Sequence, residues 1–170
     1  MSDHQRFQRV DAFTAAAEGR PGQRVFYLQV RSGPEVVTLK CEKTQVDALG
    51  QYLDRLLSDL AQPSSLPHGS ALEPATPLLS SFVIGSISVA FDPQVDRFEV
   101  ELEEVIAVDE EGEPLPESLE DHGLVRFRLE RGQARAFASH AAELVAAGRP
   151  PCRFCGSPLD PDGHLCPRMN

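Results

Sequence analysis

The chain has 170 residues, with 16 lysine or arginine and 26 aspartate or glutamate residues, which gives a formal net charge of −10. This length can bury a hydrophobic core without disulfides, and no apolar run reaches the roughly 18–20 residues that span a bilayer. The acidic charge repels phosphate backbones and anionic lipids, so neither nucleic acid nor membrane binding is expected.

The N-terminal segment is polar from Met1 to Phe7 and lacks the basic and apolar regions of a signal peptide. A cytoplasmic protein is therefore expected. Apolar and polar side chains mix over residues 6–17, and a turn is predicted at residues 19–22, where two glycines enclose an arginine and a proline.

Residues 23–40 are predicted to form a β-hairpin. Apolar side chains alternate along residues 23–31, a Ser-Gly-Pro turn follows, and the β-branched residues 35–40 return. A helix is then predicted over residues 42–60, because its apolar residues recur at steps of three and four and share one face. These apolar residues are Val46, Leu49, Leu53, Leu56, Leu57 and Leu60.

The segment from residue 61 to residue 78 contains four prolines with intervening serine, glycine and alanine residues. Proline lacks a backbone donor and interrupts both helices and strand ladders, so a linker or a long surface loop is predicted. This segment need not be a domain boundary, because one sheet could receive strands from both sides of it.

The second half repeats the order of the first. Strands are predicted over residues 81–91, 96–108 and 123–129, with an acidic loop before the third, and a helix over residues 131–147. Glu104 interrupts the alternation of the second strand, which indicates a bulge or a change of register.

The two predicted helices begin alike, with Glu42-Lys43-x-Gln45 in the first half and Glu130-Arg131-x-Gln133 in the second. We interpret the two halves as a duplicated strand–strand–strand–helix unit, although any two amphipathic helices resemble one another. Tight hairpins favour antiparallel pairing. The predicted fold class is therefore α+β, with a mainly antiparallel sheet, helices on one face and a C-terminal zinc knuckle.

The predicted domain organisation follows from these elements. A duplicated α+β domain spans residues 1–149, and a zinc-knuckle tail spans residues 150–170. Within the domain, the first half covers residues 1–60, the proline-rich loop residues 61–78, and the second half residues 79–149.

Thirteen of the 26 acidic residues lie between Asp92 and Asp121, where Arg97 is the only basic residue. A solvated acidic face with a loop explains this segment, and a surface for a basic partner is the alternative.

Three glutamates in this segment, Glu99, Glu101 and Glu103, alternate along one predicted strand. They could bind a hard cation, but alternation on a solvent-facing strand explains them more simply. Their spacing matches that of Arg126 and Arg128, so we predict cross-strand pairing between the two sets.

The C-terminal residues carry the most specific pattern in the chain, Cys152-x2-Cys155-x10-Cys166, with His164 two residues before the last cysteine. Zinc binds four thiolate or imidazole ligands in a tetrahedron, and C-x2-C supplies two of them from one turn. Gly156 suits such a turn, because glycine adopts positive φ without steric cost. The pattern predicts one structural zinc ion bound by Cys152, Cys155, His164 and Cys166.

Other interpretations of this pattern stay open. The fourth ligand could instead be one of Asp160, Asp162, His122 and His140. A redox C-x-x-C pair usually lies at a helix N-terminus, whereas Cys152 follows a predicted helix and two prolines. A catalytic zinc needs an open coordination position, and a disordered tail would bind no metal. Cys41 lies apart, at a predicted strand end, and is expected to be a packed thiol.

The sequence contains no glycine-rich phosphate loop, nucleophile elbow or H-E-x-x-H motif, so no catalytic residue is predicted. We expect a soluble, zinc-braced binding or interaction module with a protein or small-molecule partner, and not an enzyme. The alternative is a small-molecule enzyme whose pocket lies between the two halves, with the knuckle as a lid.

Four segments together resemble a known family. They are Pro21–Gln29, Glu42-Lys43-x-Gln45, Gln133–Ala138 and above all the pattern from Ala147 to Asn170. The chain resembles the actinobacterial family catalogued as domain of unknown function 3090, described as a repeat protein. The resemblance implies a cytosolic bacterial protein of unassigned activity with no catalytic residues to carry over. Residues 6–14 depart from the family pattern, which has Phe-Asp-x-Pro-Asp-Arg-Phe and a Gly-Thr-Val strand there.

Overall fold

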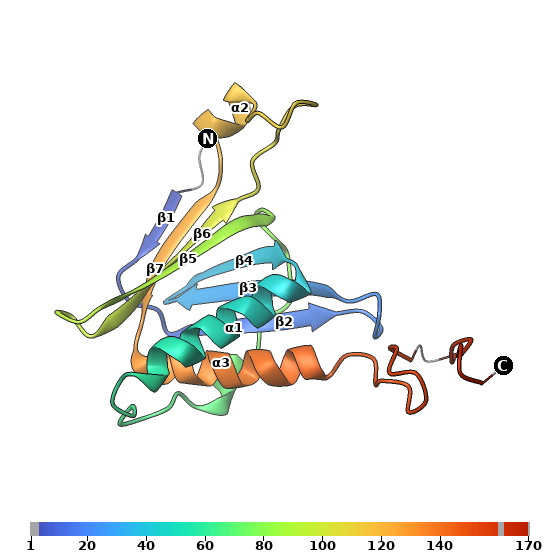
Figure 1. Ribbon diagram of the computed structural model, residues 1–170. Coiled ribbons are helices and arrows are strands. Elements are labelled where there is room, and N and C mark those ends of the chain that lie inside the picture. Colours follow the sequence, from blue (N-terminus) through green and yellow to red (C-terminus); the bar gives the residue numbers. More distant parts are fainter. Residues whose placement is uncertain (1–3, 160–161, 170) are drawn as a thin grey trace.

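The structure, a computed structural model, describes residues 4–159 and 162–169 and confirms the α+β class (Figure 1). The strands are β1 His4–Phe7, β2 Ala12–Glu18, β3 Val25–Ser32, β4 Glu35–Cys41, β5 Ile84–Asp92, β6 Arg97–Glu104 and β7 Leu124–Leu129. The helices are α1 Lys43–Ser58, α2 Pro116–Glu120 and α3 Arg131–Ala146, with a 3-10 turn, η1, at Gly69–Leu72.

The strands form two sheets, and not the one sheet expected. The first has the order β1-β7-β6-β5, and the second has the order β2-β3-β4. Neighbouring strands are antiparallel except β1, which lies parallel to β7. Hairpin turns determine which consecutive strands pair, but they do not decide whether two hairpins also join edge to edge. The division into two sheets is therefore a tertiary feature.

Each half contains the predicted order of three strands and a helix, β2-β3-β4-α1 and β5-β6-β7-α3. Both helices also begin with the same capping box. The Glu42 N–H donates to the Gln45 side chain at 2.9 Å, and the Glu130 N–H donates to the Gln133 side chain at 2.9 Å. Such boxes satisfy backbone groups that a helix start leaves unpaired. An origin by duplication stays a prediction.

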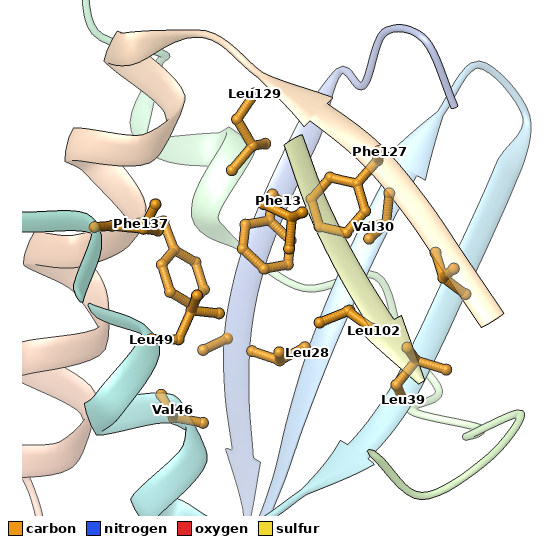
Figure 2. Packing of buried hydrophobic residues seen from close by; sticks show 14 of the residues in the cluster. Phe13, Leu28, Val30, Leu39, Val46, Leu49, Leu102, Phe127, Leu129 and Phe137 are labelled. Carbon is orange, nitrogen blue, oxygen red and sulfur yellow. The ribbon is translucent and has the colours of Figure 1, made fainter. Parts of the chain in front are cut away.

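The two long helices lie side by side and enclose a continuous hydrophobic core with the inner faces of both sheets (Figure 2). Three phenylalanine rings meet there. The Phe13 ring centroid lies 4.8 Å from that of Phe127 and 4.4 Å from that of Phe137. Because Phe13 belongs to β2 while the other two belong to β7 and α3, the two halves share one core.

The predicted pairing of glutamates and arginines on the outer face of β6 and β7 is confirmed. Glu99 lies opposite Arg128, and Glu101 lies opposite Arg126. Arg126 forms an ion pair with Glu101, and Arg128 approaches Glu99 at 3.3 Å. All four side chains are partly exposed to solvent, which screens such pairs, so each stabilises the sheet by about 1 kcal/mol at most.

The register changes opposite Glu104, although the extra residue lies on β5 and not on β6 as predicted. The register of β5 against β6 shifts between Ile84 and Ser86, opposite the end of β6. Gly85 lies at the shift, and a Cβ there would approach the Cα of Val105 at 2.6 Å. A glycine is therefore required where the two backbones come so close.

The proline-rich segment packs on the outer face of the β2-β3-β4 sheet, which the expectation of a linker or surface loop did not include. Gln29 of β3 lies at the centre of this contact and is 1% exposed. Its Nε2 donates to the Ala75 carbonyl at 2.9 Å, and its Oε1 accepts the Ala75 N–H at 2.7 Å. The side chain thereby pairs with the loop backbone much as a neighbouring strand would.

Two further polar side chains of this face bind the same segment. The Thr14 hydroxyl donates to the Leu72 carbonyl at 2.6 Å, and Arg31 donates to the Ala71 and Glu73 carbonyls, each at 3.0 Å. Buried polar groups need hydrogen-bond partners, and here the loop backbone supplies them. The polar side chains on the outer face of β3, Gln29 and Arg31, bind this loop and do not simply face solvent.

Replacing Gln29 with leucine is expected to release the loop from the sheet. The substitution keeps the side-chain size but leaves both polar groups of Ala75 unpaired, at a cost of about 2 kcal/mol in unfolding free energy. Amide exchange over residues 70–76 should accelerate while α1 and α3 stay protected. Gln62→Leu, at an exposed position of the same loop, is the matched control. Unchanged exchange in Gln29→Leu would contradict this anchoring role.

Candidate metal centre

The first two cysteines of the C-terminal tail, residues 150–169 as described, lie on one tight turn. The Cys152 N–H donates to the Ser157 carbonyl at 2.7 Å, and the Gly156 N–H donates to the Cys152 carbonyl at 2.8 Å. Gly156 has a φ of +74°, which side-chain-bearing residues rarely adopt. This geometry agrees with the turn predicted from the C-x2-C spacing.

The second pair, His164 and Cys166, follows a chain reversal at Gly163, whose φ is +87°. The Arg168 guanidinium donates to the Phe154 carbonyl at 3.1 Å and links this part of the tail to the cysteine turn. The reversal returns the chain to the first two cysteines.

The four predicted ligand atoms converge, all lying within 4.8 Å of one another. The Sγ atoms of Cys152 and Cys166 are 4.0 Å apart, and the Cys155 Sγ lies 3.7 Å from the His164 Nε2. Tetrahedral zinc, with Zn–S bonds of about 2.3 Å, separates its ligand atoms by roughly 3.4–3.8 Å. A disulfide needs about 2.05 Å, and these cysteines are free thiols. The group can therefore hold one metal ion.

The surroundings of the thiols differ. Cys152 and Cys166 are buried, whereas Cys155 and His164 are partly exposed. Hydrogen bonds with Ser157 lower the pKa of the Cys155 thiol to about 7, whereas burial raises the pKa of Cys166. The thiolate is the form that binds metals, so Ser157 favours metal binding at Cys155. Sequence reasoning did not identify Ser157 as part of the site. Its position two residues after Cys155 is the signal that could have indicated it.

The alternative ligands are not brought to this cluster among the described residues. Asp162, His122 and His140 do not belong to it, and Asp160 lies outside the described residues. The His140 Nε2 instead lies 2.8 Å from the carbonyl of residue 15, on β2. Cys41 is buried at the end of β4, where burial raises the pKa of its thiol to about 12, as expected of a packed thiol.

A groove of about 640 Å³ lies between α1 and β5, and therefore between the two halves. Its lining includes Gln45, Tyr52 and Arg55 from α1, and Ile87 and Val89 from β5. Its lining residues include no histidine, cysteine or carboxylate, which are the usual general acids and bases. The groove can accommodate a ligand.

Among the described residues, none of the helices has both the length and the apolar character needed to cross a membrane.

The chain belongs to the family described as a protein of unknown function (DUF3090), whose model matches residues 5–166. The match includes all four residues of the metal-binding group. Neither a curated protein nor a solved structure matches the chain.

Proposed function

We propose that the C-terminal tail, residues 150–170, binds one structural zinc ion and serves as a docking module for a protein partner, carried by an α+β domain of residues 1–149. The observation that carries this proposal is the convergence of three thiols and one imidazole within 4.8 Å. Cys3His is a common ligand set of structural zinc sites. With all four positions filled by protein, the ion has no open position for a substrate or a reactive water.

The tail also needs the metal to become ordered. Cys152 and Cys166 are its buried residues among those described, so it lacks an apolar core of its own. Structural zinc binding supplies about 10–16 kcal/mol in small zinc peptides, enough to fold a segment of this size. The zinc ion takes the place of a hydrophobic core.

The position of the tail favours docking over bracing of the main domain. The tail extends away from the end of α3 in Figure 1. The hydrogen bonds found for described residues 150–169 join tail residues to one another, as between Leu159 and Pro150. Zinc would therefore order the tail and change the rest of the fold little.

The tail carries large apolar side chains that stay exposed. Leu165 is 97% exposed, Met169 68% and Phe154 50%. Apolar and aromatic residues of this kind supply the central contacts of protein interfaces. A zinc-ordered segment holds these side chains in fixed positions, which lowers the entropy cost of binding a partner.

Replacing Leu165 and Met169 with serine is expected to remove partner binding without removing zinc, because neither side chain belongs to the metal-binding group. Proteins captured by the wild type, by this double variant and by Cys152→Ala should be compared quantitatively. A docking partner is lost from both variants and retained by Leu79→Ser, which changes a leucine of the main domain that is 76% exposed. Identical captured sets for all four proteins would contradict docking by the tail.

The second candidate function is that of a small-molecule enzyme with its pocket between the halves. The groove between α1 and β5 supports a ligand site at that place. The lining includes Tyr52 but no histidine, cysteine or carboxylate, so the groove supports ligand binding and does not by itself assign a catalytic group. A small molecule that binds the zinc-free protein and changes the environment of Tyr52 would favour this candidate.

A further inference from the structure

A second cavity, of about 390 Å³, lies where β3 and β4 meet the start of α1 and the end of α3. Four of the residues that line it are cationic, namely Arg24, Lys40, Lys43 and Arg149. The chain contains only two lysines, and both lie here. We call this cavity, with its four cationic residues, the basic pocket.

The positive charge of the basic pocket is opposite in sign to the formal net charge of the chain, which is −10. Half of the acidic residues lie between Asp92 and Asp121, a segment that contributes no residue to the lining of the pocket. The lining contains one carboxylate, that of Glu42, and this side chain belongs to the capping box of α1. The pocket therefore concentrates positive charge on a protein that is otherwise acidic.

Two glycines allow the cationic groups to come close to the backbone. A Cβ on Gly148 would lie 3.0 Å from the Lys43 Nζ and 3.6 Å from an Arg24 guanidinium nitrogen. A Cβ on Gly22 would lie 3.0 Å from the Arg149 Nε. The heads of Lys43 and Arg24 thus gather at the end of α3, where their like charges repel one another.

Contacts within the protein occupy only some of the cationic groups of the basic pocket. Arg24 donates to the Leu144 carbonyl at 3.2 Å in the last turn of α3 and stacks over the Phe26 ring. The two lysine ammonium groups, in contrast, form neither an ion pair nor a hydrogen bond with any residue that the structure describes. Their donors remain available to a ligand.

We propose that the basic pocket binds a small molecule through its phosphate group. Lysine and arginine donate charge-assisted hydrogen bonds to phosphate oxygens, and a multiply charged phosphate neutralises several converging cations better than one carboxylate does. The pocket also includes the first residue of α1, whose positive end favours an anion. Cys41 also lies in its lining, where burial raises the pKa of its thiol. None of the four metal-binding residues lines this pocket.

Pyrophosphate and malonate are suitable probes of this pocket. Each is titrated into the full chain by calorimetry at constant ionic strength. Pyrophosphate is expected to bind saturably and more tightly than malonate. The double variant Lys40→Ala, Lys43→Ala should weaken pyrophosphate binding at least about tenfold, because two charge-assisted contacts are lost. Both lysines are exposed, so the fold should persist.

The matched control is Arg6→Ala, Arg9→Ala, which removes the same charge from exposed positions near the N-terminus and should change the affinity less than about twofold. Three results would each overturn the proposal. They are the absence of saturable pyrophosphate binding up to about 10 mM, an unchanged affinity in the lysine variant, and an equal loss in both double variants. Malonate binding as tight as that of pyrophosphate would overturn the phosphate assignment.

Discussion

Replacing Cys152 or Cys166 with alanine is expected to abolish tight zinc binding, whereas the wild type should retain one zinc ion per chain after dialysis. Structural zinc sites supply about 10–16 kcal/mol from four ligands, so one ligand accounts for roughly 3–4 kcal/mol, or about 100- to 1000-fold in affinity. Metal analysis gives the stoichiometry, and competition with a coloured chelator gives the affinity.

The chain offers a matched control for these variants. Cys41→Ala makes the same chemical change at a buried thiol that lies outside the cluster, and it should keep one tightly bound zinc. His164→Ala tests the fourth ligand separately, because full retention of one tight zinc would exclude His164. Zinc retained by both Cys152→Ala and Cys166→Ala would contradict the metal centre as a whole.

Zinc removal should also distinguish the tail from the main domain. Chelation is expected to collapse the chemical-shift dispersion of tail amides, while the melting temperature of the α+β domain changes little. A large drop in that temperature would favour bracing over docking.

Replacing Phe137 with alanine is expected to be the most destabilising single change in the main domain. Phe137 is fully buried and stacks on Phe13, so truncation costs about 3–5 kcal/mol, out of the 5–15 kcal/mol typical of a domain. Urea unfolding followed by circular dichroism measures the loss.

The same experiment tests whether the two halves unfold together. Because Phe13 and Phe137 come from different halves, the unfolding curve should keep one transition and move as a whole to lower urea. Phe154→Ala, at a ring that is 50% exposed in the tail, is the control and should stay within about 0.5 kcal/mol of the wild type. A loss below about 1 kcal/mol in Phe137→Ala, or two separate transitions, would contradict the shared core.

Features that follow from a regular period or a short spacing were predictable. The two long helices, the hairpins and the pairing of Arg126 and Arg128 with the glutamates of β6 follow from periods of 3.6 and 2 residues. The Cys3His group was also predictable, because its four members lie within fifteen residues and two turns bring them together. Strand β1 was missed, because four residues with one buried side chain carry too little alternation to be recognised.

Contacts between distant segments that no regular spacing marks were not predictable. The binding of Gln29 to Ala75, for example, joins β3 to a loop 46 residues away. The basic pocket could not be predicted from the sequence, because Arg24, Lys43 and Arg149 come together only when α1 and α3 pack side by side.

The sequence by itself therefore determined the α+β class, the order of the hairpins and the two long helices, and the cysteine and histidine residues that the structure brings together. The tertiary structure alone decided that the strands divide into two sheets, that the proline-rich segment covers one of them, and that the cationic side chains line one cavity. Periodicity and spacing describe contacts within a turn or a hairpin. Contacts between distant segments depend on how the whole chain buries its apolar surface, and no local sequence pattern predicts them.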